Sequence, residues 1–248
     1  MSVDRVRIGV DGARDGWAVA AVDFAARVDL RRVDDLEDIF ERWPAAEQIW
    51  VDIPIGLPFD DEVRACDTMA RRALAGGRAS SVFTPPCRRA LEAENHEEAS
   101  RINREVTGRG LSIQAWHLGA KILEVDALKR VDSKWTERIR ESHPEVVFAL
   151  LAAATPGWPS TSARGSLPVL ESKKSAEGRE QRIALLEHHL PGSAAALDAV
   201  AVPRAQVALD DWIDALGLAA AQHISRGRSV SWPHPPAAGR LFGRHDVC

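Results

Sequence analysis

Residues 6–11 read VRIGVD, an alternating apolar run that ends in a carboxylate at Asp11. The alternation predicts a strand with one apolar face. A second apolar run, IWVD at residues 49–52, also ends in an acid, Asp52. An acid at the end of a buried strand is costly to desolvate, so two of them at such positions require an explanation beyond the fold.

A third group of acids lies in the last long helical pattern, residues 207–224. One face of this predicted helix carries an apolar stripe that two acids interrupt, in the order Val207, Asp211, Asp214 and Leu218. Asp210 is rotated by about 100° from that face, which predicts a partner in solvent or a nearby arginine. We therefore expect the carboxylates of Asp211 and Asp214 to face the sheet. Clustered carboxylates repel one another unless a cation separates them, and oxygen-only clusters suit Mg²⁺ or Mn²⁺.

Hydrophobic periodicity predicts the order of the remaining elements. Strands are expected over residues 5–10, 17–22, 28–33, 48–53 and 137–142. Helices are expected over residues 35–43, 60–75, 88–105, after 110, 144–153, 176–190 and 207–224. The short spacing of the first three strands favours antiparallel hairpins, and the apolar fourth strand favours an interior position. This order predicts a mixed α/β sheet with helices on both faces.

Composition bounds the class of protein. The chain has 248 residues, of which 45% are hydrophobic and 27% charged, as in an ordinary globular protein. Residues 1–7 lack the apolar core of a signal peptide and no run is long enough to span a membrane, so we expect a cytoplasmic location and no membrane partner. Three widely spaced cysteines with no Cys-x-x-Cys predict neither a disulfide framework nor a structural zinc site.

Charge gives a weak indication about partners. The net charge of −4 argues against a chain that coats nucleic acid. Residues 64–109, however, contain nine arginines and six acids, a local balance of +3 that would suit a phosphate backbone. Arg88 and Arg89 follow the stiff segment 84–86, so they are the first candidates for a nucleic-acid contact. A solvated pair of helices explains the same charges.

Five motifs together resemble one family closely. They are GVDGARDGW (residues 9–17), VDIPIGLP (51–58), SVFTPP (81–86), ESHPE (141–145) and DDxxDA (210–215). The chain resembles, over residues 6–224, the uncharacterised family of predicted nucleases with a ribonuclease H-like fold, catalogued as domain of unknown function 429. The resemblance implies a mixed five-stranded sheet flanked by helices. We expect one domain over residues 1–226, a helical insertion at about 60–132 between the fourth and fifth strands, and a C-terminal surface tail at 227–248.

The resemblance also implies roles for particular acids. Asp11 and Asp52 match the positions of metal-binding acids at two strand ends, and Glu141 is similar to the family's acid on the fifth strand. The pattern of Asp211 and Asp214 is similar to that of the junction resolvases. Each acid also has a structural reading: Asp11 as a turn residue, Asp52 as a strand-end cap and Glu141 as a surface strand end.

The expected function is metal-dependent phosphodiester hydrolysis of DNA or RNA by a two-metal-ion mechanism. The resemblance implies that Asp11, Asp52 and Asp214 bind Mg²⁺ or Mn²⁺, and that Glu141 or Asp211 completes the site. Lys173 is a candidate contact for a substrate phosphate, although a solvated lysine at a helix start fits its position equally well. Two alternatives stay open: a nucleotide-binding or phosphotransferase-type protein of the same superfamily, and a non-catalytic binding protein that retains the fold.

Overall fold

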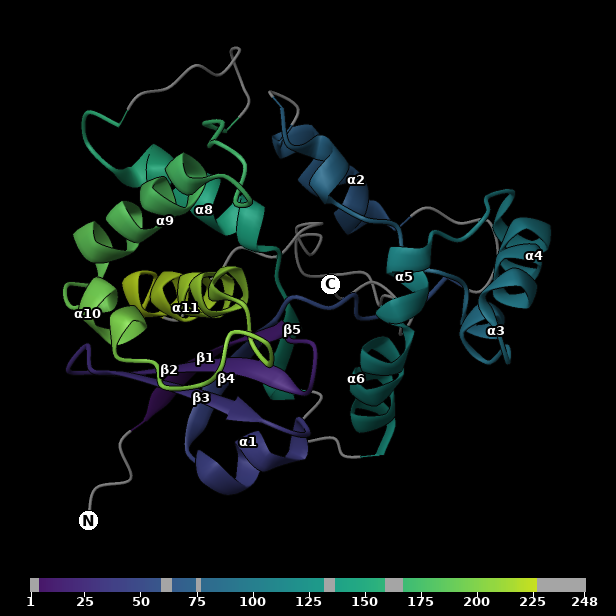
Figure 1. Cartoon of the computed structure of the whole chain (residues 1–248), viewed down its shortest axis with the longest axis horizontal. Helices are drawn as coiled ribbons and strands as arrows, with labels where there is room; N and C mark the ends of the chain where they lie inside the picture. Colours follow the sequence, from purple (N-terminus) through teal and green to yellow (C-terminus); the bar gives the residue numbers. More distant parts are fainter. Residues whose placement is uncertain (1–4, 59–63, 75–76, 132–136, 159–166, 227–248) are drawn as a thin grey trace, which may run out of the picture.

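The computed structural model describes residues 5–58, 64–74, 77–131, 137–158 and 167–226. Its centre is a five-stranded sheet with the order β3-β2-β1-β4-β5 (Figure 1). The strands are β1 (Val6–Gly12), β2 (Trp17–Asp23), β3 (Val28–Val33), β4 (Ala46–Val51) and β5 (Ile139–Glu141). The mixed sheet with five strands confirms the architecture that the sequence predicts.

The strand directions follow from the lengths of the connections. β1, β2 and β3 pair antiparallel through short turns. β4 pairs parallel with β1, and β5 pairs parallel with β4. Because parallel neighbours require a crossover, α1 (Glu37–Arg42) separates β3 from β4, and the long helical segment separates β4 from β5. The C-terminal ends of β1, β4 and β5 therefore meet at one edge of the sheet.

The helices agree with the predicted pattern in type and differ in their divisions. They are α2 (Ala65–Ala73), α3 (Arg88–Leu91), α4 (His96–Thr107), α5 (Ile113–His117), α6 (Gly119–Val131), α8 (Pro144–Ala154), α9 (Ala176–His189), α10 (Ser193–Asp198) and α11 (Leu209–Ile224), with a 3₁₀ turn at Ala79–Ser81. The helix expected over 88–105 is two helices, because the Asn95 side chain caps α4 by accepting from the Glu98 N–H at 3.0 Å. The sequence did not predict α10.

Two apolar layers cover the two faces of the sheet. Even-numbered residues of β1 face the layer that includes α1 and α6. Alternate residues of β2 and β4, among them Ala18, Ala20 and Trp50, face the layer formed by α8, α9, α10 and α11. Figure 1 shows α11 lying on the sheet, with α8 and α9 stacked beyond it. The helical predictions for residues 144–153, 176–190 and 207–224 thus place three helices on one face.

Residues between β4 and β5 form the helical segment that the sequence predicted as an insertion. α3, α4 and α5 share a small apolar cluster of their own, built around Cys87, Ala90 and Ala99. They extend to one side of the sheet in Figure 1. The predicted surface tail at residues 227–248 lies outside the described residues. Among the described helices, none is both long and apolar enough to cross a membrane.

Candidate functional site

Asp11 and Asp52 lie side by side where two parallel strands end. β1 and β4 pair through Val10 and Val51, and the Asp52 N–H donates to the Val10 carbonyl oxygen at 3.0 Å. Asp11 Oδ1 accepts from the Gly12 N–H at 2.8 Å. The pairing register therefore brings together the two acids that the sequence singled out, although they are 41 positions apart.

A glycine lets the last helix approach these strand ends. A Cβ atom on Gly9 would lie 2.0 Å from the carbonyl oxygen of Ala215, so α11 crosses β1 at a distance that only glycine permits. Gly9 and Asp11 share one face of β1, because side chains alternate along a strand. Asp214 precedes Ala215 and is 1% exposed. The close crossing thus places a buried carboxylate beside Asp11.

The three acids interact electrostatically with one another. Burial raises the pKa of Asp11 well above its ordinary value, and the charges of Asp52 and Asp214 raise it further. Burial also raises the pKa of Asp52. Burial raises the pKa of Asp214 to about 6, although Lys173 acts in the opposite direction. Three acids that resist ionisation at one sheet edge form a site where a cation would bind favourably.

Lys173 contributes a cation to this cluster. Its Nζ donates to Asp214 Oδ2. Burial alone lowers the pKa of Lys173, but the carboxylates of Asp214, Asp11 and Asp52 outweigh it and raise the pKa above its ordinary value. The residue that the sequence proposed as a phosphate contact is thus ion-paired within the acid cluster.

A second lysine, Lys121, lies on the other side of the strand end. Its Nζ donates to the Gly16 carbonyl oxygen at 2.5 Å and lies 4.4 Å from the centre of the Trp17 ring. Burial lowers the pKa of Lys121, whereas Asp11 and Asp211 act to raise it. No periodic or motif signal distinguishes Lys121 in the sequence, because only the packing of α6 brings it there.

Asp211 has a structural role in the same region. Its Oδ2 accepts from the Ala208 N–H at 3.0 Å, which caps the start of α11. Burial raises the pKa of Asp211, and it also lies near Lys173 and Lys121. Asp210, which was expected to have a nearby arginine as partner, lies 3.9 Å from Arg179.

A buried ion pair between Glu145 and Arg182 lies next to the acid cluster. Arg182 is fully buried, and its Nη2 donates to both carboxylate oxygens of Glu145 at 2.9 Å. Arg182 Nη1 also donates to the Glu171 carbonyl oxygen at 2.9 Å, close to Lys173 in the chain. The Glu145 charge acts to raise the pKa values of Asp52 and Asp214. A glutamate in the first turn of a helix gives no sequence signal of such a pairing.

Glu141 lies apart from the other predicted acids. It shares the face of β5 with Ile139, which packs in the layer of α1 and α6, away from α11. Its Oε2 accepts from the Ile55 N–H at 2.7 Å and from Arg64 Nη2. The charges that act on the pKa of Glu141 come from Arg64 and Asp67, after the larger effect of burial.

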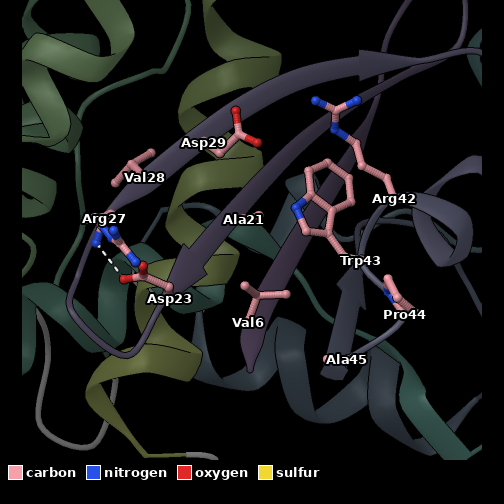
Figure 2. Close-up of a pocket in the computed structure, with 10 residues that line it drawn as sticks. All are labelled: Val6, Ala21, Asp23, Arg27, Val28, Asp29, Arg42, Trp43, Pro44 and Ala45. Carbon is pink, nitrogen blue, oxygen red and sulfur yellow. Dashed lines mark hydrogen bonds and ion pairs between the residues drawn. The ribbon is translucent and has the colours of Figure 1, made fainter. Parts of the chain in front are cut away.

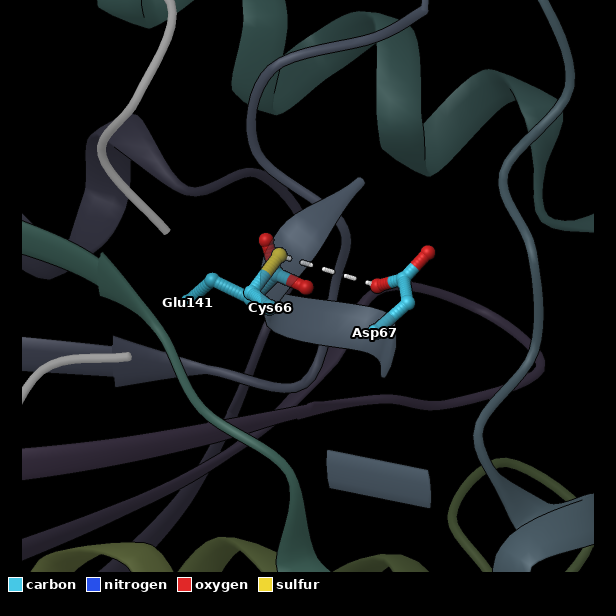
Figure 3. A group of neighbouring side chains, drawn as sticks. All are labelled: Cys66, Asp67 and Glu141. Carbon is cyan, nitrogen blue, oxygen red and sulfur yellow. Dashed lines mark hydrogen bonds between the residues drawn. The ribbon is translucent and has the colours of Figure 1, made fainter. Parts of the chain in front are cut away.

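Glu141 belongs instead to a second group, with Cys66 and Asp67 (Figure 3). The potential ligand atoms of these three residues lie within 4.8 Å of one another. Arg64 already supplies a cation here, because it pairs with Glu141 and lies 3.4 Å from Asp67. Arg64 Nη2 also donates to Cys66 Sγ at 3.2 Å. These contacts favour a structural role for this group.

Asp11, Asp52 and Asp214 are more widely spread than that group. Within the described residues, they are not among the sets of three whose ligand atoms all lie within 4.8 Å of one another. Like charges without a divalent ion between them are expected to stay apart, and here an ammonium group is the cation among them. Binding of a metal ion would therefore draw these side chains closer.

Several arginines of the segment 64–109 donate hydrogen bonds to other residues of this protein. Arg88 donates to Asp126 from Nη1 and Nη2, at 2.5 and 2.8 Å. Further internal contacts are made by Arg64, Arg71, Arg78 and Arg101. Arg89 is exposed. The two arginines proposed for nucleic-acid contact thus differ, since only Arg89 points its charge to solvent.

A hollow of about 390 Å³ lies at the opposite end of the sheet (Figure 2). It is lined by the start of β1, the end of β2 and the segment 42–45. Of its charged groups, Asp23 and Arg27 neutralise each other through a 2.5 Å contact. Asp11 stands at the other end of β1, so this hollow is separate from the acid cluster.

The comparison with protein families agrees with the resemblance that the sequence motifs indicate. No curated protein and no solved structure matched this chain. A family model described as protein of unknown function (DUF429) matches residues 9–238. That match includes residues 9–12 of β1 and all of β4 and α11, which carry the acid cluster. The chain therefore belongs to the DUF429 family.

Proposed function

We propose that this protein hydrolyses phosphodiester bonds of nucleic acid with Mg²⁺ or Mn²⁺ bound by Asp11, Asp52 and Asp214. The observation that carries the proposal is the convergence of two buried acids, Asp11 and Asp214, with the half-buried Asp52, at the ends of two parallel strands and on the helix that crosses them. A protein gains nothing in stability from burying like charges together, so their clustering favours a function.

The donor set fits a hard divalent ion. It consists of carboxylate oxygens, which Mg²⁺ and Mn²⁺ prefer. Lys173 already acts as a stand-in cation, since its ammonium group binds Asp214 and interacts with Asp11 and Asp52. The pKa values of all three acids are raised, so a cation at the site would favour their ionised forms.

The chain's own residues would act in distinct ways. A bound divalent ion would activate a water molecule and stabilise the leaving oxygen. Asp11 and Asp52 would hold the ion on the rigid sheet edge, and Asp214 would hold it from α11. Asp211 would keep the start of α11 in place through its cap, and the Glu145–Arg182 pair would fix the loop that carries Lys173. Glu141 is left out of the proposed ligand set, because Arg64 holds it on the other face.

The topology supports the same proposal. The motifs imply a mixed five-stranded sheet of the ribonuclease H-like kind, and the order β3-β2-β1-β4-β5, in which only β2 is antiparallel to the others, is compatible with it. The resemblance implies that an acid at the end of the first strand binds catalytic metal, and Asp11 is the acid of this chain that matches it. Fold similarity alone does not define the reaction, so the acid cluster carries more weight.

The test is a cleavage assay on defined substrates: single-stranded DNA and RNA, duplexes, an RNA–DNA hybrid and a four-way junction. We expect cleavage that needs Mn²⁺ or Mg²⁺ and falls by about 100-fold or more in Asp11→Asn, since even residues behind the ligands contribute 10–100-fold. The matched control is Asp15→Asn, because Asp15 is an exposed acid in the turn that follows.

Equal cleavage by the wild type and Asp11→Asn would contradict the proposal. Metal binding without cleavage of any polymer would direct attention to a small phosphorylated substrate. A protein that binds neither metal nor nucleic acid would fit the non-catalytic alternative.

A further inference from the structure

The ammonium group of Lys173 lies among the acids of the candidate site. A site whose acids were balanced by metal ions alone would not need it. Its Nζ donates to Asp214 Oδ2, and its charge also acts on Asp11 and Asp52. The Asp214 side chain is 1% exposed, whereas that of Lys173 is 35% exposed. The Lys173 side chain is therefore partly open to solvent, whereas the carboxylate that it binds is not.

The backbone around Lys173 is held in place by neighbouring contacts. Arg179 Nη1 donates to the carbonyl oxygens of Lys173 and Lys174, at 3.3 and 2.9 Å. The start of α9 packs directly on the same loop, because a Cβ atom on Gly178 would lie 2.0 Å from the Ser172 carbonyl oxygen. Packing of the loop thus fixes the backbone position of Lys173, whereas a lysine on an open surface loop would have no such restraint.

The charges near the strand ends favour one divalent ion over two. The three proposed ligands, Asp11, Asp52 and Asp214, interact there with the ammonium group of Lys173. Lys121 is not counted, because the Glu124 carboxylate is the largest charge that acts on it, and Asp211 is not counted, because it caps α11. When the three ligands and Lys173 are ionised, two negative charges remain in excess, and one divalent ion matches them. The number of free ligand oxygens also favours one ion, because Lys173 already binds one of the two carboxylate oxygens of Asp214.

We propose that the Lys173 ammonium group takes the place of a second metal ion, so that the site binds one divalent ion. This inference rests on the proposed metal-dependent hydrolysis and defines how that site is charged. Lys173 then acts as a positioning residue that binds one oxygen of Asp214 and balances its charge, while Asp11, Asp52 and the other oxygen of Asp214 hold the ion. A site with one divalent ion and one ammonium group would differ from the two-ion arrangement that the family resemblance implies.

The test is a calorimetric titration of the full chain with Mn²⁺. Lys173→Met removes the ammonium group at similar side-chain length, and Lys173→Arg keeps the charge. Lys174→Met is the matched control, because Lys174 is the exposed neighbour. We expect the wild type, Lys173→Arg and Lys174→Met to bind one Mn²⁺. We expect Lys173→Met to bind two, with the first bound at least about tenfold more tightly, because the repulsion from the ammonium group is gone.

The outcomes separate this inference from the proposed function. A wild type that binds two ions, or a Lys173→Met variant that binds one ion with unchanged affinity, would overturn the inference and leave the metal site standing. Absence of Mn²⁺ binding in every variant would overturn both. If Lys173→Met does not fold, the stoichiometry of the wild type and Lys173→Arg still decides between one ion and two.

Discussion

Replacing Asp214 by Asn is expected to stabilise the metal-free protein at neutral pH. Asp214 is almost completely buried, and its pKa is raised from an ordinary value of 3.8 to about 6. Each unit of difference between the folded and unfolded pKa corresponds to about 1.4 kcal/mol. The ionised Asp214 therefore costs about 3 kcal/mol of folding free energy at pH 7.5, an order of magnitude that Asn would recover.

The stabilisation expected for Asp214→Asn depends on pH. Because the folded pKa is the higher one, the folded state binds more protons than the unfolded state between about pH 3.8 and 6. The wild type thus keeps its full stability below pH 3.8 and loses the contribution of Asp214 as the pH rises through 6. The difference between Asp214→Asn and the wild type should be near zero at pH 3.8 and largest above pH 6.

The assay is urea unfolding in the presence of a chelator, at several pH values. Asp210→Asn is the control on the same turn of α11, and it should change the free energy of unfolding by no more than about 0.5 kcal/mol. Added Mn²⁺ should stabilise the wild type and should have less effect on Asp214→Asn. If Asp214→Asn is less stable than the wild type by the same amount at every pH, the ion pair with Lys173 is structural and the reasoning is refuted.

Three further predictions concern the surroundings of the site. Gly9→Ala should lower the free energy of unfolding by several kcal/mol and reduce Mn²⁺ affinity, because its Cβ would meet the Ala215 carbonyl oxygen at 2.0 Å; a melting temperature equal to the wild type would contradict this. Arg89→Ala should weaken nucleic-acid binding, reduce the slope of log K against log salt concentration by about one, and leave metal affinity unchanged. An unchanged slope in a filter-binding assay would mean that Arg89 is a solvated surface charge. Glu141→Gln should leave the Mn²⁺ affinity within about twofold while it destabilises the contact with Arg64, and a tenfold loss of affinity would place Glu141 in the metal site.

The sequence predicts the parts of the site that depend on local periodicity. Strand alternation and a following turn indicate that Asp11 and Asp52 stand at strand ends, and helical periodicity places Asp214 on the buried face of α11. Both patterns repeat within a few residues, so one sequence suffices to read them. The antiparallel pairing of the first three strands also follows, since short spacings favour hairpins.

The parts that the sequence does not predict depend on long-range packing. Lys173 contacts Asp214 across 41 residues, and Arg182 contacts Glu145 across 37. The face on which Glu141 lies depends on the pairing of β5 with β4, which periodicity within a three-residue strand cannot define. Charged residues on helices are usually solvated, so no local pattern marks the few that are drawn into a site.

The most direct test of the metal site is a crystal structure grown with Mn²⁺, in which anomalous scattering locates the ion. We expect an anomalous peak at the ends of β1 and β4, from an ion coordinated by oxygens of Asp11, Asp52 and Asp214, with the Lys173 ammonium group nearby. A peak at Cys66, Asp67 and Glu141, or no peak at millimolar Mn²⁺, would contradict it.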